Sequence, residues 1–134
     1  MDDYADFGEI CRLRRLVGWE VWEADEKQVI AGYLTRTATL AHGRLVGWAG
    51  SVQWQGDQVM LVDLMVHPQH RCCGIASELV LRTSRLLYRR GVSSIETMCY
   101  LDNRRLFEKC GFRTCVQPEW NGLLRLARTA EQTG

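Results

Sequence analysis

The sequence has little of several features that would mark a special class of protein. Only 2 of its 134 residues are proline, and no apolar stretch approaches the length of a transmembrane helix. The 17 Lys and Arg nearly balance the 16 Asp and Glu, so no overall field attracts nucleic acid or an anionic membrane. The acidic start Met1-Asp2-Asp3 is unlike a signal or transit peptide. We therefore expect a cytoplasmic protein that holds any anionic partner at a local site.

The cysteines lack the CxxC spacing of a zinc or redox motif, although six are many for this length. Hydrophobic residues make up 46% of the chain, enough for a core that needs no disulfides. We interpret all six as reduced thiols. They are Cys11, Cys72, Cys73, Cys99, Cys110 and Cys115.

The chain contains no internal repeat and no Pro/Ser-rich linker, which predicts a single α/β domain over residues 1–134 with a flexible tail at 128–134. Apolar periodicity and glycine stops predict helices at 4–17, 24–36, 74–90 and 103–110. Alternation and turn residues predict strands at 37–41, 45–54, 58–67, 92–100, 112–116 and 123–127. The strand–helix–strand unit over 58–100 favours one parallel pair inside an otherwise antiparallel sheet.

The most informative segment is the connection between the strand at 58–67 and the long helix that begins near Gly74. Unpaired backbone N–H groups from Arg71 to Ala76 should converge there, and the helix dipole adds positive potential. Gly74 has no side chain to obstruct a phosphate. On these residues alone, the segment is either an anion-binding loop or an ordinary strand–helix connection.

Two motifs give this segment a wider context. Arg71-Cys72-Cys73-Gly74-Ile75-Ala76 matches the pattern Gln or Arg, two residues, Gly, one residue, Gly or Ala. Further on, Leu106-Phe107-Glu108-Lys109-Cys110-Gly111-Phe112 looks like the segment Phe-Tyr-Glu-Lys-x-Gly-Phe. With both motifs in this order, the chain resembles the GNAT superfamily of acyl-CoA-dependent N-acyltransferases over roughly residues 40–116.

The resemblance implies a mixed, mostly antiparallel central sheet with flanking helices, in which two parallel strands, here 61–67 and 93–99, splay apart around the thioester. It implies acetyl-CoA as co-substrate, with its pyrophosphate on the loop amides and its pantetheine arm against the main chain of Met65 and His67. The implied activity is acetyl transfer to a primary amine of a small molecule or peptide by direct attack in a ternary complex. The full set of implied cofactor residues is Met65, Val66, His67, Arg71, Cys72, Cys73, Gly74, Ile75, Ala76, Asn103 and Phe107.

Proton transfer needs a base, because an alkyl amine with a pKa near ~10 is mostly protonated at neutral pH. Asp63 is the first candidate, or else a carboxylate that only bonds to loop backbone. Phe107 stands where many members of this family have a tyrosine acid, so Tyr100 is a substitute acid or a buried strand-end residue. Asn103 either caps the short helix or contacts pantetheine.

The acceptor side is predicted with less support from motifs. Glu20 and Glu23 are candidates for binding a cationic amine. The rings of Trp19, Trp22, Trp48 and Trp54 are candidates for lining a pocket that takes an aromatic or cationic amine. The alternatives are surface carboxylates for the two glutamates and core packing for the tryptophans, above all for Trp48.

Two other functions stay open at this level. His67, His70, Cys72 and Cys73 form a cluster of potential metal ligands, which would suit a metal- or thiol-sensing protein. The absence of the usual tyrosine at Phe107 would suit an acyl-CoA-binding sensor with weak catalysis. A homodimer formed through the C-terminal strands is a further expectation.

Overall fold

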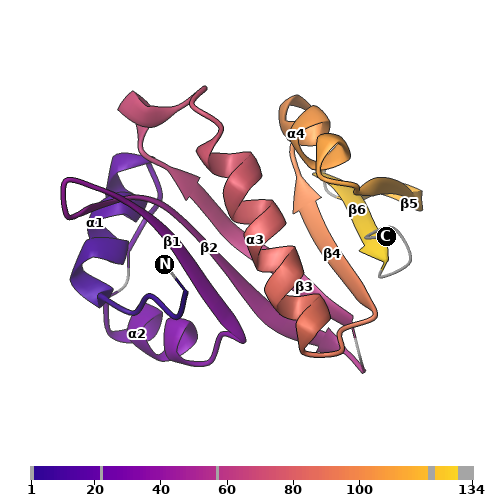
Figure 1. Ribbon diagram of the computed structural model, residues 1–134, viewed down its shortest axis with the longest axis horizontal. Helices are drawn as coiled ribbons and strands as arrows, with labels where there is room; N and C mark the ends of the chain where they lie inside the picture. Colours follow the sequence, from indigo (N-terminus) through magenta and orange to yellow (C-terminus); the bar gives the residue numbers. More distant parts are fainter. Residues whose placement is uncertain (1, 22, 57, 121–122, 130–134) are drawn as a thin grey trace.

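A computed structural model describes the backbone of residues 2–21, 23–56, 58–120 and 123–129 and shows one six-stranded sheet with helices on both faces (Figure 1). The strands run in the order β1-β2-β3-β4-β6-β5. Of the pairs in this sheet, β3 and β4 are parallel and the others antiparallel, which confirms the predicted fold class. The strands are β1 (Thr35–Ala41), β2 (Arg44–Gln55), β3 (Gln58–Val66), β4 (Ser94–Cys99), β5 (Arg113–Trp120) and β6 (Leu123–Thr129).

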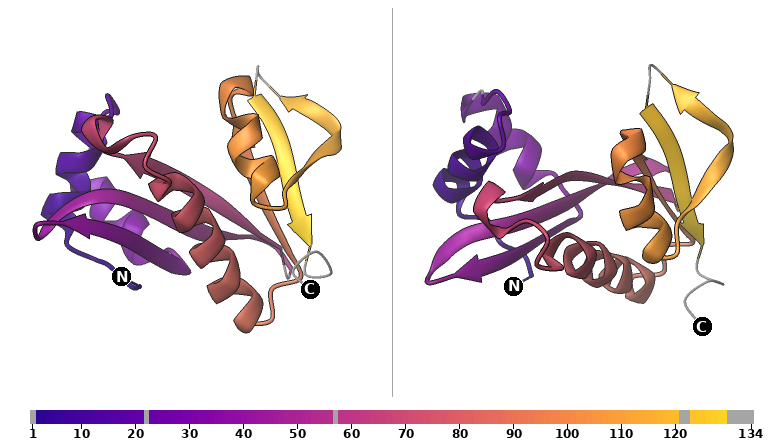
Figure 2. Two further views of the ribbon diagram at one scale, coloured as in Figure 1. Left: turned by 45° about the horizontal axis from the view of Figure 1, so that its top comes forward. Right: turned by 90° about the horizontal axis from the view of Figure 1, so that it is seen from above.

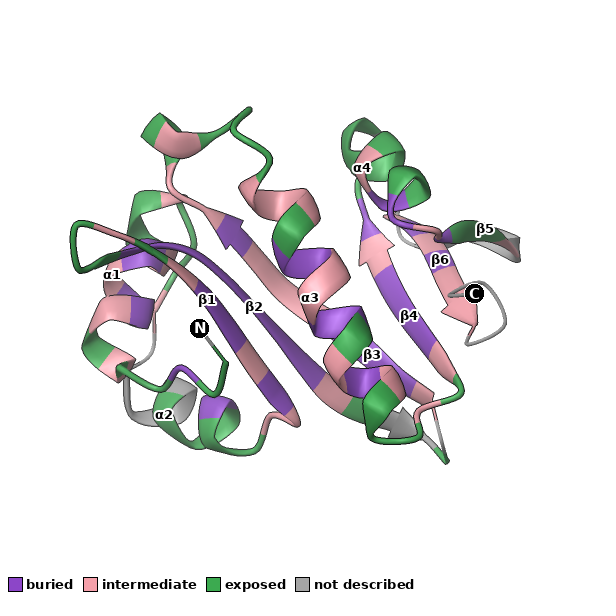
Figure 3. Cartoon of the chain, in the orientation of Figure 1, coloured by how far each residue is buried: buried purple, intermediate pink, exposed green. Residues whose placement is uncertain are grey.

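The helices divide into two layers (Figure 2). On one face, α1 (Phe7–Leu16) and α2 (Glu23–Ala31) lie over β1, β2 and β3, with a core that includes Ile10, Leu13 and Trp48. On the other face lie α3 (Ile75–Arg89) and α4 (Arg104–Lys109), whose core includes Val80, Leu87 and Phe107. In the central strand β2, every residue from Leu45 to Ser51 is buried, as a strand covered on both faces of the sheet requires (Figure 3).

The start of α3 rests directly on β2. Gly47 has no side chain, and a Cβ built on it would lie 2.6 Å from Ile75 Cγ2 and 3.0 Å from Leu79 Cδ1. Only glycine permits this close approach. The first turn of α3 is therefore held against the sheet at the point where the preceding loop ends.

Several predicted boundaries are wrong, and three of them have a clear physical cause. The first helix begins at Phe7 and not at residue 4, because Asp6 Oδ1 caps it by accepting from Glu9 N–H. The second helix ends at Ala31 and not at 36, because Thr35 already pairs with Ser51 in the sheet. The predicted tail at 128–134 is too long, since Arg128 and Thr129 belong to β6. Residues 130–134 lie outside the described part of the chain.

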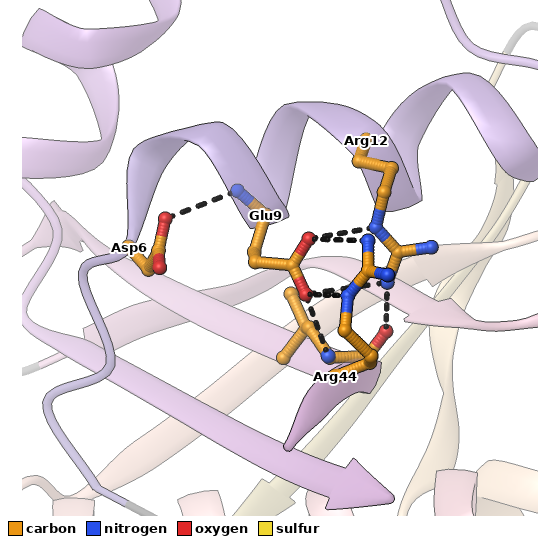
Figure 4. Close-up of polar contacts among 5 residues, drawn as sticks. Asp6, Glu9, Arg12 and Arg44 are labelled. Carbon is orange, nitrogen blue, oxygen red and sulfur yellow. Dashed lines mark hydrogen bonds and ion pairs between the residues drawn. The ribbon is translucent and has the colours of Figure 1, made fainter. Parts of the chain in front are cut away.

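Glu9 fastens α1 to the beginning of β2 (Figure 4). Its carboxylate accepts from Arg44 Nε (2.9 Å), Arg12 Nε (2.7 Å) and Leu45 N–H (3.1 Å). Arg12 Nη2 also donates to the Leu45 carbonyl at 3.1 Å. Arg44, followed by Arg12, holds the pKa of the Glu9 carboxyl far below its usual range. One carboxylate thus joins a helix and a strand that are far apart in the sequence.

None of the helices that the structure describes has the length and apolar character needed to span a bilayer.

We predict that Glu9→Gln destabilises the protein near neutral pH by about 1–2 kcal/mol, because an amide cannot satisfy both guanidinium groups. A carboxyl whose pKa is depressed by folding stabilises the fold above its unfolded pKa of ~4.3 and loses that contribution as the pH falls further. Urea unfolding at pH 7 and at pH 3 checks this, with a smaller difference between variant and parent at pH 3.

The matched control is Glu108→Gln. Glu108 forms an exposed ion pair with Arg104 (2.6 Å) one helical turn away, and such helical pairs contribute about 0.3–0.5 kcal/mol. Equal losses for Glu9→Gln and Glu108→Gln at pH 7 would contradict the anchoring role of Glu9.

Candidate functional site

A cavity of about 510 Å³ opens beside the loop that leads into α3. It is bounded by the loop and the first turn of α3, by the end of β3 and by the segment after β4. From these elements its lining includes Leu64, Met65, Val66, His70, Arg71, Cys72, Gly74, Ile75, Ala76, Ser77, Tyr100, Asn103 and Leu106. The structure thus brings together most of the residues predicted for the cofactor, whereas Cys73 and His67 are not among those lining this cavity.

The loop geometry fits a phosphate group. Gly74 is the N-cap of α3 with φ +80°, and a Cβ built on it would meet no atom within 4 Å. The N–H groups of Ile75, Ala76 and Ser77 lie in the first turn of α3, where a helix offers them no acceptor. Backbone donors and the positive end of the helix dipole therefore face open space at this end of the cavity.

The predicted main-chain role of His67 is wrong. Its N–H donates to the Val46 carbonyl at 2.7 Å, and its carbonyl accepts from His70 N–H at 2.8 Å. Successive residues of a strand direct their backbone groups to opposite edges, so Met65 also faces β2. Val66, between them, presents its N–H and carbonyl to the edge that borders the cavity. Val66 is therefore the residue able to hold an extended ligand as an added strand.

A β-bulge at Asp63 explains why this alternation is hard to read from the sequence. The pairing of β2 with β3 passes from Trp48–Met65 to Gly50–Val62, so that Asp63 and Leu64 share one partner position. Asp63 has φ +56°, which is unusual for a residue with a side chain. The bulge turns the Asp63 side chain toward α1.

Asp63 Oδ2 is held by two side chains and not by loop backbone as the structural alternative supposed. It accepts a hydrogen bond from the Tyr33 hydroxyl and pairs with Arg14 Nη1 at 3.2 Å. Tyr33 fits here because Gly50 leaves room, since a Cβ on Gly50 would lie 2.6 Å from Tyr33 Cε2. The carboxylate is oriented, only partly exposed and beside a second cavity.

This second cavity, of about 410 Å³, lies between β3 and β4. The two strands pair over Gln58–Met60 and Ser94–Glu96 and then separate, as the resemblance implied. The cavity is lined from both strands and from the segment that follows β4. The lining residues are Trp19, Met60, Leu61, Val62, Asp63, Leu64, Thr97, Met98, Cys99, Tyr100, Asn103, Phe107 and Leu123.

Three predicted residues after β4 reach this region. Tyr100 is 68% exposed and lines both cavities, so the alternative that it is buried is wrong. Asn103 occupies the N-cap position of α4 without a capping side-chain bond, and it also lines both cavities. Phe107 is buried against Phe112 with ring centroids 5.5 Å apart, and its ring lines the second cavity only.

The acceptor-side predictions have mixed outcomes. Glu20 is exposed and is not among the residues that line either cavity. Trp22, together with the side chains of Glu23 and Trp54, lies outside the described residues. Trp19, one of the tryptophans expected to line an acceptor pocket, lines both cavities, and the Arg14 guanidinium stands over its ring at 5.1 Å.

Trp48 is fully buried between the helices and the sheet, as expected. Arg14 and Tyr33 are the site residues that sequence reasoning missed. The available signal was Arg14, a charged residue that interrupts the apolar pattern of the first helix.

Among the described residues, the structure offers no set of ligands for the metal-binding alternative. Within residues 2–21, 23–56, 58–120 and 123–129, no three His, Cys, Asp or Glu side chains converge on one point. The His67 and His70 rings lie 5.3 Å apart, but His67 Nδ1 accepts a hydrogen bond from Gln69 N–H.

Comparisons with known proteins agree with this geometry. The chain is 36% identical over 74 residues to GCN5-related N-acetyltransferase 3, chloroplastic, of Arabidopsis thaliana, a match that covers 55% of this chain and 31% of that protein. The chain thus spans about a third of the length of that relative.

Solved structures share the fold at identities below 25%. An aminoglycoside 6'-N-acetyltransferase complexed with coenzyme A superposes with a TM-score of 0.82, at 18% identity and 96% coverage of both chains. The ribosomal-protein-S18-alanine N-acetyltransferase from Escherichia coli superposes with a TM-score of 0.77, at 18% identity over 96% of this chain and 94% of its own.

The sequence model of the acetyltransferase (GNAT) family matches residues 3–112, most of the chain. Together with the splayed strands and the loop at the start of α3, this match shows that the chain belongs to the GNAT acetyltransferase family.

Proposed function

We propose that this protein transfers an acetyl group from acetyl-CoA to a primary amine by direct attack within a ternary complex. The observation that carries the proposal is that the two cavities adjoin. Trp19, Leu64, Tyr100 and Asn103 line both of them, so a ligand held at the loop can extend into the space between β3 and β4. Similar structures are described as acetyltransferases of aminoglycosides and of a protein alanine, which are both amine acceptors.

The residues of the first cavity fit the anionic and extended parts of the co-substrate. Acetyl-CoA supplies an activated acetyl thioester. The amides of Ile75 and Ala76, with the open space at Gly74, bind its pyrophosphate. The main chain of Val66 pairs with the pantetheine arm. The Asn103 side chain, free of a capping role, is positioned to hydrogen-bond the same arm.

Asp63 is the group that we propose takes the proton of the acceptor ammonium, directly or through one water. Tyr33 and Arg14 fix its orientation, and its carboxylate borders the cavity where the acceptor and the thioester meet. Tyr100 is the hydroxyl that we propose protonates the departing thiolate, since it lines both cavities. Phe107 cannot do so, although it stands where the family motif has a tyrosine.

Phe107 also favours a second function, an acyl-CoA-binding sensor with little turnover. Loss of one general acid typically lowers the rate by ~10²–10⁴-fold without abolishing it, so we place the enzyme first. Turnover with any amine decides between the two functions. The cytoplasmic location and the homodimer expected from the sequence stay predictions.

We predict that Gly74→Ala strongly lowers the affinity of the protein for acetyl-CoA. The new Cβ would stand where the phosphate is expected, and the left-handed backbone adds a strain of about 1–2 kcal/mol. Isothermal titration with acetyl-CoA measures the loss of affinity.

The matched control is Gly43→Ala in the hairpin between β1 and β2. Gly43 has nearly the same φ, +78°, and the same open surroundings, but it lies away from both cavities. It should lose similar stability and bind acetyl-CoA normally. Equal affinities for the two variants would refute the loop assignment.

We predict that Asp63→Asn lowers turnover at pH 7 by roughly 10²–10⁴-fold and leaves the affinity for acetyl-CoA unchanged. Much of the lost rate should return above pH ~9.5, because an acceptor with a pKa near ~10 then loses its proton unaided. Steady-state kinetics from pH 6 to pH 10 check this, with Asp102→Asn, an exposed acid outside both cavities, as the control. The same fractional loss at every pH would assign Asp63 a structural role only.

A further inference from the structure

The inner end of the second cavity is closed by one hydrogen bond. The last paired residues of the parallel strands are Met60 and Glu96, and the next residue of β4, Thr97, donates its hydroxyl to the Leu61 carbonyl at 3.1 Å. Beyond this bond β3 and β4 separate. Leu61 and Thr97 therefore mark the vertex of the cleft, and both line the cavity.

The walls next to this vertex are apolar. Leu61, Cys99 and Phe107 are each at most 5% exposed and belong to the core beneath α3, yet all three line the cavity. Burial raises the pKa of the Cys99 thiol, which therefore stays neutral and packs like a small apolar side chain. The Thr97 hydroxyl already donates its hydrogen to the Leu61 carbonyl.

The chemistry of the walls limits what can fill this space. A polar or charged group placed there would lose its water without gaining a partner from Leu61, Cys99 or Phe107. A hydrocarbon group would gain from burial at the same place. Phe107 matters here, because a tyrosine at this position would bring a hydroxyl to the same wall.

Resting on the proposed function, we propose that the space next to the vertex between β3 and β4 is an acyl-chain pocket that accepts chains longer than acetyl, with Cys99 as the wall residue whose size limits its volume. The same site then binds short-chain acyl-CoA donors such as propionyl- or butyryl-CoA as well as acetyl-CoA, and holds the longer chains more tightly. Thr97 is a positioning residue that fixes the vertex through Leu61.

Binding in the absence of an acceptor amine tests the proposal without depending on turnover. Isothermal titration with free CoA, acetyl-CoA, propionyl-CoA and butyryl-CoA should give affinities that rise about twofold to fourfold with each added methylene. The heat-capacity change of binding should become more negative along the same series, as apolar burial requires.

Two Cys99 variants should shift this series in opposite directions. Cys99→Ala enlarges the pocket and should raise the affinity for butyryl-CoA relative to acetyl-CoA at least twofold. Cys99→Val fills the pocket and should remove the gain for the longer chains. Cys110→Ala is the control, because Cys110 is buried in the same core but does not line the cavity. If Cys99→Val proves too destabilised to study, the alanine variant carries the test.

The outcomes separate this inference from the proposed function. Failure of free CoA and of every acyl-CoA to bind would overturn both. Binding of CoA with no dependence on chain length would overturn the acyl-chain pocket alone and would leave the space to an apolar part of the acceptor. An equal effect of Cys99→Ala and Cys110→Ala on the series would also overturn the role of Cys99.

Discussion

The separation of β3 from β4 is the constraint on which the site depends. Two parallel strands that stay paired leave no room between them, and here the pairing stops after Met60 and Glu96. Beyond that point the unpaired edge of β3 offers backbone groups to a ligand, and side chains from both strands face a common space. The sheet stays intact despite this opening, because β2 holds the far edge of β3 and β6 holds the far edge of β4. The cleft is thus a gap between two well-supported halves.

The bulge at Asp63 determines which polar groups of β3 lie beside this opening. It turns one carboxylate toward α1, where Arg14 and Tyr33 hold it, and it changes which backbone groups of β3 face the cleft. Arg14 also stands over the Trp19 ring, so the segment after α1 is joined to the same cluster. The helical layer on this face therefore belongs to the active centre that we propose, while α3 supplies the anion-binding end.

The parts of the site that depend on local sequence were predictable. A strand, a loop with Gly74 and a long helix are enough to predict where backbone amides lack helical acceptors, because such amides occur wherever a helix begins. The assignment of these amides to a phosphate came from the family resemblance and stays a proposal. Phe107 was correctly placed beside the cleft by its motif. The parallel pairing of β3 with β4 followed from one crossover unit among hairpins, whereas the position of β6 between β4 and β5 was not predicted. The second helix was predicted to end too late in the sequence, because the pairing of Thr35 with Ser51 in the sheet overrides the local helix propensity there.

The parts that depend on distant contacts were not predictable. The main-chain role given to His67 failed because the N–H of that residue is bonded to β2, in a register that passes a bulge. Nothing near Asp63 in the sequence shows that Arg14 and Tyr33 will meet it. Tyr100 is exposed only because β4 ends at Cys99, which leaves the next residue beyond the sheet. Such features arise when separate elements pack together.

The central claim is that the open edge of β3 and the start of α3 together receive the CoA moiety. Residue-resolved amide hydrogen exchange by NMR, with and without saturating coenzyme A, tests it most directly. The account predicts slower exchange at Val66, Ile75 and Ala76 in the complex, with no change at His67, whose N–H is already bonded to Val46. Tight binding that leaves the exchange of Val66, Ile75 and Ala76 unchanged would contradict it.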